Sequence, residues 1–193
     1  GDVIYTGTPG TTRQIKPGQY IPNDALMDAG AAFEGIDHAS ALIGNLGMYG
    51  PVYSHLVRTY CAGDYEAMAK TVLQVRASGV GASVEPLDLT TLQGKPEVVV
   101  PQLVQAYGGH AELAGYVFLR AVARACVDGL DRVADLLKKD RPNRVAMTGN
   151  WFANAAFKAL LQDCNLEVLD TPGAFDATNL GAASEALRRY SIT

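Results

Sequence analysis

The chain has 193 residues, of which 48% are hydrophobic and 19% charged, and its formal net charge is −4. A chain of this length buries about 70% of its unfolded surface, so it needs neither disulfides nor structural metals, and its composition excludes global disorder. Basic residues form no cluster beyond the pairs at 138–139 and 188–189. A nucleic-acid groove needs a concentrated basic face and is therefore not expected.

The three cysteines, Cys61, Cys126 and Cys164, lie far apart and form no CxxC or Cys/His spacing. We therefore expect buried, reduced thiols and a cytoplasmic protein rather than a disulfide framework or a zinc site. No apolar run reaches the roughly 20 residues of a membrane helix, and the opening Gly1-Asp2 predicts no signal peptide. The lack of an initiator Met is compatible with a processed or truncated piece of something longer.

The N-terminal part predicts a β-meander. Residues 3–6 form the expected first strand, and a Gly/Pro turn leads into a second strand at residues 11–15. Another turn precedes a third short strand at residues 19–21. Residues 24–43 are rich in Ala and Gly and are expected to be partly helical, around residues 31–33.

The middle of the chain predicts helices. A loop at residues 44–51 is followed by helices at 52–61 and 64–78, the second with Asp64 as its N-cap. Residues 79–96 are irregular and form the best candidate for a linker or surface excursion, since they carry three Gly and two Pro residues.

The next two segments differ in how clearly they can be read. Residues 98–106 are apolar but broken by Pro101, so an edge strand and the first turn of a helix both remain open. A long helix is predicted over 111–137, because its apolar residues recur at spacings of three and four: Phe118, Val122, Cys126, Leu130, Val133 and Leu137.

The end of the chain predicts a parallel βαβα unit. Its expected strands are residues 144–148 and 166–169, and its expected helices are residues 151–163 and 176–190. Overall, the predicted fold is a single α/β lobe spanning residues 1–193.

Gly149-Asn150 is the first candidate for ligand binding, because a predicted strand passes there directly into a helix. Backbone N–H groups at a helix N-terminus carry a partial positive charge, and Gly permits close approach of a ligand. Asn150 and Asn154 add amides that could hydrogen-bond a base or a ribose. The alternative is that Gly149 only closes a tight turn and Asn150 caps the helix.

The second candidate is the predicted hairpin tip from Gly7 to Thr12. Its glycines and hydroxyls, including Gly7, Thr8, Gly10 and Thr11, could cradle a phosphate through backbone N–H groups. It lacks the P-loop pattern, and an ordinary β-turn is the alternative.

Other polar residues predict neither a metal site nor a catalytic residue. We interpret the following as surface or satisfied core residues: His38, His55, His110, Asp24, Asp28 and Asp37.

Residues 144–187 resemble the C-terminal end of FGGY-type carbohydrate kinases and their actin-like relatives. The segments that carry the likeness are TGNW at 148–151 with Asn154, DATNLGAA at 176–183, and the preceding helix LRAVARACVDGLDRVADLL at 119–137. The N-terminal Gly7-Thr8 hairpin and the segment DAGAAFEGI at 28–36 resemble the same template.

This resemblance implies an actin-like (ribonuclease H-like) lobe that binds ATP with Mg²⁺ and helps transfer a phosphoryl group to a sugar hydroxyl. It implies phosphate contacts at Gly7, Thr8 and Gly10, and an adenosine site lined by the amide-bearing segment Gly149-Asn150 with Asn154. The sugar-binding half and the catalytic base of the family are missing from this chain. A second chain or an N-terminal lobe is therefore expected as a partner, and a homo-oligomer is possible.

Two alternatives stay open. Residues 1–21 also resemble the fumarylacetoacetate hydrolase family, through GDVIYTGTPG followed by IKPGQ, which implies a metal-dependent hydrolase fragment. The other alternative is a non-catalytic structural or assembly protein in which the glycine loops are ordinary turns.

Overall fold

The computed structural model describes residues 3–6, 10–13, 21–28, 31–34, 41–45, 49–147 and 153–169. Its elements in chain order are β1 (Val3–Thr6), β2 (Gly10–Arg13), α1 (Asn23–Asp28), β3 (Ala31–Glu34), β4 (Ala41–Asn45), α2 (Gly50–Tyr60), α3 (Tyr65–Ser78), the 3₁₀ turns η1 (Val80–Ser83) and η2 (Leu89–Thr91), α4 (Pro96–Ala106), α5 (Ala111–Leu137), β5 (Arg144–Met147), α6 (Ala155–Asp163) and β6 (Glu167–Leu169).

The strands form one mixed sheet in the order β3-β4-β2-β1-β5-β6. β2 runs antiparallel to its two neighbours, β1 and β4, whereas β1, β5 and β6 are mutually parallel. β3 is antiparallel to β4 at one edge of the sheet. The strands β4, β1, β5 and β6 therefore all point the same way, and the mixed α/β class expected from the sequence is correct.

The first hairpin was predicted correctly, but the next segment was not. The expected helix around residues 31–33 is wrong, because these residues form β3 and pair with β4, with Phe33 opposite Leu42. Among the described residues of this segment, helix is found in α1, just upstream. Of the third strand expected at residues 19–21, only Ile21 is described, and it is not in a strand.

The expected loop at residues 44–51 is also wrong at both ends. Gly44 and Asn45 complete β4, where they pair with Thr11 and Gly10 of β2. At the other end, Gly50 already begins α2.

The helices of the middle segment largely follow the prediction. The Asp64 side chain accepts a hydrogen bond from the Ala67 amide at 2.9 Å and so caps α3 as expected. The segment that the sequence left open is the helix α4, which tolerates Pro101 within it. Pro101 lacks an N–H and removes one backbone hydrogen bond, but four buried apolar residues hold α4 against its neighbours: Val99, Val100, Leu103 and Val104.

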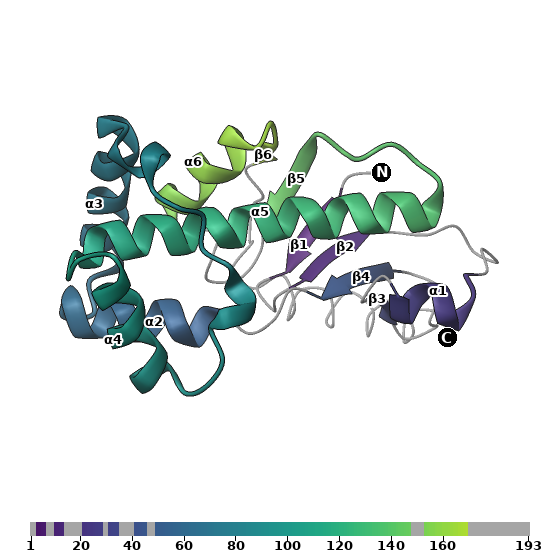
Figure 1. Cartoon of the computed structure of the whole chain (residues 1–193). Coiled ribbons are helices and arrows are strands. Elements are labelled where there is room, and N and C mark those ends of the chain that lie inside the picture. Colours follow the sequence, from purple (N-terminus) through teal and green to yellow (C-terminus); the bar gives the residue numbers. More distant parts are fainter. Residues whose placement is uncertain are drawn as a thin grey trace, which may run out of the picture.

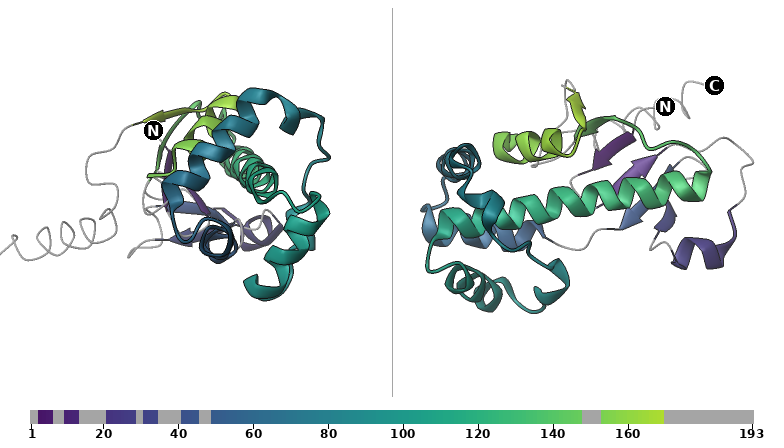
Figure 2. Two further views of the ribbon diagram at one scale, coloured as in Figure 1. Left: turned by 90° about the vertical axis from the view of Figure 1, so that its left-hand side faces the viewer. Right: turned by 45° about the horizontal axis from the view of Figure 1, so that its top comes forward.

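Helix α5 is the spine of the molecule. All six residues of its predicted apolar stripe are buried, at 5% exposure or less. Figure 1 shows α5 running from the other helices across the sheet, and Figure 2 shows the same arrangement from two further sides. Its contacts include α2, α3, α4 and α6 as well as β2 and β4. A separate small apolar cluster joins Val133 and Leu137, near the end of α5, to Ile21 and Leu26.

We call residues 49–110, which hold α2, α3, η1, η2 and α4, the helical lobe. Within it, residues 79–96 are irregular apart from their two 3₁₀ turns, and they pack on α5. Arg120 of α5 donates hydrogen bonds to the carbonyls of Gly81 at 2.7 Å and Val84 at 3.1 Å. The Tyr116 ring covers Gly81 so closely that a Cβ there would lie 2.1 Å from the ring. The excursion is thus fixed in place by α5.

The C-terminal unit has the expected order of strand, helix and strand. β5 and β6 are parallel. Helix α6 lies between these two strands in sequence and packs against α5 and α3. Helix α6 begins at Ala155, four residues later than predicted, because Asn154 is its N-cap. The predicted turn at 149–150 and the final helix at 176–190 lie outside the described residues.

Two expectations from the sequence can be compared with the structure, one about the cysteines and one about membrane helices. Cys126 is buried as expected, whereas Cys61 and Cys164 are only half-buried, and all three are free thiols. Within the described ranges, no helix is both long and apolar enough to cross a membrane.

Candidate functional site

The carboxyl ends of four parallel strands meet at one side of the sheet, which we call the carboxyl edge. Thr6, at the end of β1, pairs with Gly10 of β2, and Gly10 pairs with Asn45 at the end of β4. On the other side of β1, Tyr5 pairs with Met147, the last residue of β5. In α/β sheets ligands bind outside the carboxyl ends of strands, so this edge is the first place to look for a site.

The sequence-predicted phosphate residues fall at this edge or just beyond it. Gly10 and Thr11 form the start of β2 and pair with both β1 and β4, so they belong to a strand rather than to a free hairpin tip. Gly7 and Thr8 lie between β1 and β2, outside the described residues.

The other predicted glycine turn leaves the neighbouring strand. Gly149 and Asn150 follow β5 and also lie outside the described residues. Because β1 and β5 are adjacent, parallel and in register at Tyr5 and Met147, the chain enters both predicted turns from the same edge. Two segments about 140 positions apart in sequence thus begin side by side.

Asn154 has a more specific place than the sequence predicted. Its side-chain oxygen accepts the Phe157 backbone N–H at 3.0 Å, which makes it the N-cap of α6 rather than a residue within the first turn. The cap uses only the amide oxygen of Asn154. An Asn side chain also carries two N–H donors, which this cap does not use. Asn154 can therefore hold the start of α6 and still donate hydrogen bonds.

Tyr53 of α2 is a site residue that sequence reasoning missed. It is 4% exposed, its ring stacks on Phe118 with centroids 6.3 Å apart, and its hydroxyl oxygen is shielded from solvent. Burial raises the pKa of Tyr53 to about 12, while a polar interaction with the Asn154 side chain opposes the rise. The hydroxyl therefore stays protonated at neutral pH. Its one sequence signal was a polar atom on the apolar side of a predicted helix.

The helix N-termini divide into two groups by charge. The first turns of α3, α4 and α5 each carry an acid, namely Glu66, Glu97 and Glu112. The first turns of α2 and α6 carry no acid. At α2, the side chain of the N-cap residue Tyr49 makes no capping hydrogen bond. A helix N-terminus has a partial positive charge, which an acidic side chain neutralises. The helices α2 and α6, which follow the carboxyl ends of β4 and β5, thus keep the partial positive charge of their N-termini.

The helical lobe borders this region through Tyr49. The ring of Tyr49 packs edge-on against Phe118, with centroids 6.3 Å apart. Desolvation and, less strongly, the nearby Asp88 carboxylate raise the pKa of the Tyr49 hydroxyl. Asp88 itself caps η2 and accepts hydrogen bonds from the Thr90 amide and hydroxyl, which lower its pKa. The excursion is therefore close to the start of α2.

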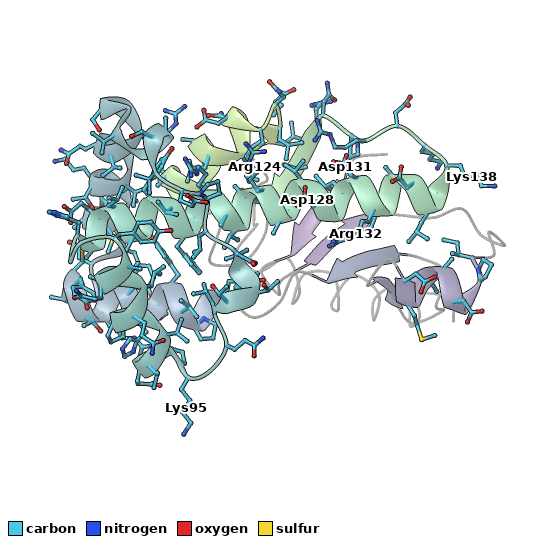
Figure 3. All side chains as sticks on the ribbon, in the orientation of Figure 1. Lys95, Arg124, Asp128, Asp131, Arg132 and Lys138 are labelled. Atoms are coloured by element: carbon cyan, nitrogen blue, oxygen red, sulfur yellow. The ribbon has the colours of Figure 1, made fainter. Side chains whose placement is uncertain are left out.

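The remaining polar candidates do not gather into a site. No group of three or more His, Cys, Asp and Glu residues that could hold a metal occurs in the described part of the chain. The exposed His110 lies 3.3 Å from Glu112 at the start of α5. A shallow hollow lined by Asp135 and Lys138 to Asp140 lies at the far end of α5, where Figure 3 marks Lys138. It is open to solvent and remote from the helical lobe.

Comparisons of the chain with protein-family models, with curated proteins and with solved structures found no match.

Proposed function

We propose that this chain is the ATP-binding lobe of an actin-like carbohydrate kinase, which transfers a phosphoryl group from Mg-ATP to a sugar hydroxyl. The observation that carries the proposal is the register of β1 with β5, which starts the two predicted glycine turns from one edge. A triphosphate and its nucleoside could then be held by residues that are distant in sequence.

The electrostatics of the carboxyl edge support an anionic ligand. The first turns of α2 and α6 have unneutralised N–H groups, which are suited to phosphate oxygens. Asn154 adds amide donors at the start of α6, where the resemblance expects contact with adenosine. The arrangement of a hairpin beside a parallel βαβ unit also supports the actin-like fold that the sequence resemblance implies.

The residues would share the nucleotide in the following way. Gly7, Thr8, Gly10 and Thr11 would contact phosphates, and Gly149-Asn150 with Asn154 would line the adenosine site. Mg²⁺ would neutralise the phosphate charge, and it would be held mainly by phosphate oxygens and water, as is usual for this ion at nucleotides. The sugar and the catalytic base would come from a second chain or a further lobe. Catalysis would then rest on positioning and charge stabilisation.

Isothermal titration with Mg-ATP tests the proposal directly. We expect binding in the micromolar to millimolar range for the chain and its loss in Gly149→Val, because a side chain would block close approach to the backbone. The thermal unfolding midpoint of the variant, which should match that of the unchanged chain, controls for misfolding.

The same titration separates the alternatives. No heat with ATP from the folded chain would overturn the kinase proposal and favour the structural or assembly protein. Mg²⁺-dependent turnover of an acylpyruvate would instead favour the fumarylacetoacetate hydrolase-like reading of residues 1–21.

A further inference from the structure

The irregular segment between α3 and α4 crosses α5, and we call its residues 80–94 the strap. In Figure 1 the strap runs from the end of α3 across α5 and on towards α4. Its two 3₁₀ turns, η1 and η2, both contact α5. The strap nevertheless buries little of itself. Gly81 is its one buried residue, and four apolar side chains are half-buried against the core: Val84, Leu87, Leu89 and Leu92.

The hydrogen bonds of the strap tie it to the rest of the molecule at one place. Arg120 of α5 donates to the carbonyls of Gly81 and Val84, at 2.7 and 3.1 Å. In the part of the chain that the structure describes, every other hydrogen bond of the strap joins residues at most three positions apart. Such local bonds maintain the shape of the strap but do not hold it on α5.

Arg120 and Tyr116 act together at this place, one turn apart on α5. The guanidinium carbon of Arg120 lies 5.4 Å from the centre of the Tyr116 ring, a cation–π distance. The same ring lies against Gly81, where a Cβ would be 2.1 Å from it. The ring and the guanidinium thus hold the first turn of the strap from the same face of α5. Beyond Val84, half-buried apolar side chains make the contact.

A glycine with positive φ lies at each end of the strap. Gly79 has a φ of 73° and ends α3, and Gly94 has a φ of 120°. A glycine can leave such a conformation for many others without a steric penalty. Both ends also have space around them. A Cβ at Gly79 would meet nothing within 4 Å, and one at Gly94 would meet only Val99, at 3.8 Å. The two glycines are therefore suited to be hinges.

We propose that the strap opens and closes as one unit, hinged at Gly79 and Gly94 and latched by Arg120 together with Tyr116. Opening breaks the two Arg120 hydrogen bonds and lifts a few half-buried side chains, so it requires much less free energy than global unfolding. It uncovers the Tyr116 ring, which is 6% exposed when the strap is closed. The strap thus controls access to this face of α5. The inference does not depend on the proposed nucleotide site.

Proteolysis of the folded chain by thermolysin, which cleaves before large apolar residues, tests the opening. We expect cleavage first before the strap leucines, Leu87, Leu89 and Leu92, because only opening makes this segment available. The cleavage rate should hardly depend on urea at low concentrations, since opening exposes little surface. A steep dependence on urea, as for global unfolding, would show that the strap does not open by itself and would overturn the proposal.

Arg120→Met tests the latch, because it keeps the apolar stem and removes the donors. Losing two charge-assisted hydrogen bonds should speed strap cleavage roughly tenfold or more. Arg124→Met is the matched control, since Arg124 is exposed one turn further along α5 and makes neither bond. It should leave the cleavage rate unchanged. Equal rates in the two variants would overturn the role of Arg120.

Gly81→Ala tests the latch from the strap side, so the proposal does not depend on one variant. The added methyl group collides with the Tyr116 ring and should also speed cleavage several-fold. Ala82→Ser, at the exposed neighbouring position, should have no such effect. Unchanged cleavage in Gly81→Ala would mean that the ring contact does not hold the strap closed.

Hydrogen exchange tests whether the strap moves as one unit. The Ala82 amide donates to Gly79 near one hinge, and the Leu92 amide donates to Leu89 near the other. If one opening exposes both amides, Arg120→Met should accelerate their exchange by the same factor. Faster exchange at Ala82 alone would show that the two ends open independently, and the single hinged strap would be wrong.

Discussion

The two helix starts that follow the carboxyl edge of the sheet, those of α2 and α6, differ in charge from the starts of α3, α4 and α5. An acid lies in the first turn of each of α3, α4 and α5, namely Glu66, Glu97 and Glu112, and Asp64 also caps α3. At the edge, the first turns of α2 and α6 carry no acid. Unneutralised N–H groups cost stability unless something else satisfies them, and an anionic ligand can do so. The starts of α2 and α6 therefore keep a partial positive charge, which is what the proposed nucleotide site requires.

The two regions are nevertheless joined by a small aromatic cluster. Phe118 of α5 is fully buried, and its ring contacts those of Tyr49 and Tyr53 at the start of α2. Changes to this buried cluster should therefore affect the start of α2, whereas changes on the lobe surface should not.

The largest expected effect comes from Phe118→Ala. Removing a fully buried ring should lower the free energy of unfolding by about 3–5 kcal/mol, measured by urea denaturation. It should also weaken Mg-ATP binding in whatever fraction stays folded, because Tyr53 loses its stacking partner. Val98→Ala, at a side chain that is 55% exposed, is the control and should change the free energy of unfolding by less than about 0.5 kcal/mol. Similar losses in the two variants would contradict the role assigned to the cluster.

The same contrast explains which parts of the fold were predictable. Helix α5 was predicted to the residue, because six apolar positions at helical spacing outweigh any local ambiguity. The strands β3 and β4 were missed, since residues such as Ala31 and Ala41 have no strand pattern of their own. Their state is decided by pairing with β2, which is distant in sequence and which local reading cannot detect.

The site was predictable in part for a related reason. Glycine turns after strands are local signals, but the predicted βαβ unit joins β5 to β6 and does not give the parallel pairing of β1 with β5. The start of α6 was placed too early, because two Asn residues could each serve as the cap and the sequence does not choose between Asn150 and Asn154. Tyr53 was missed entirely, because its burial against Phe118 depends on how α2 and α5 pack.

Adding an acid to the first turn of α6 and removing one from the first turn of α5 tests the difference in charge between these helix starts. Ala155→Glu puts an acid at the exposed start of α6, where it should raise the free energy of unfolding by about 0.3–1 kcal/mol. It should also weaken Mg-ATP binding roughly threefold or more, because a carboxylate near the bound nucleotide repels its phosphate charges. Glu112→Gln in α5 is the matched change at a neutralised helix start and should lower stability by a similar amount without altering ATP affinity. Both variants are measured by thermal unfolding and titration, and ATP binding that ignores Ala155→Glu would remove the electrostatic argument.

The smallest expected effect concerns the ion pair that ties the lobe to α6. Arg76 of α3 donates two hydrogen bonds to the Asp163 carboxylate, at 2.6 and 2.7 Å, and both side chains are more than a third exposed. The Arg76 guanidinium lowers the pKa of Asp163 below its usual value, chiefly by hydrogen bonding. An acid whose pKa is lower in the folded state contributes stability above the unfolded pKa of about 3.9 and loses it as the pH falls through the folded pKa.

A double-mutant cycle with Arg76→Gln and Asp163→Asn should therefore give a coupling free energy of at most about 1 kcal/mol at pH 7, because solvent screens a half-exposed pair. Repeated urea denaturation from pH 7 down to pH 3 should show this coupling constant until about pH 5 and then declining, as the carboxylate takes up a proton and no longer attracts the guanidinium. A coupling that stayed the same at pH 3 would mean that packing of the two side chains, rather than their charges, joins α3 to α6. The helical lobe would then be held to α6 by shape alone, and salt should have no effect on the cycle.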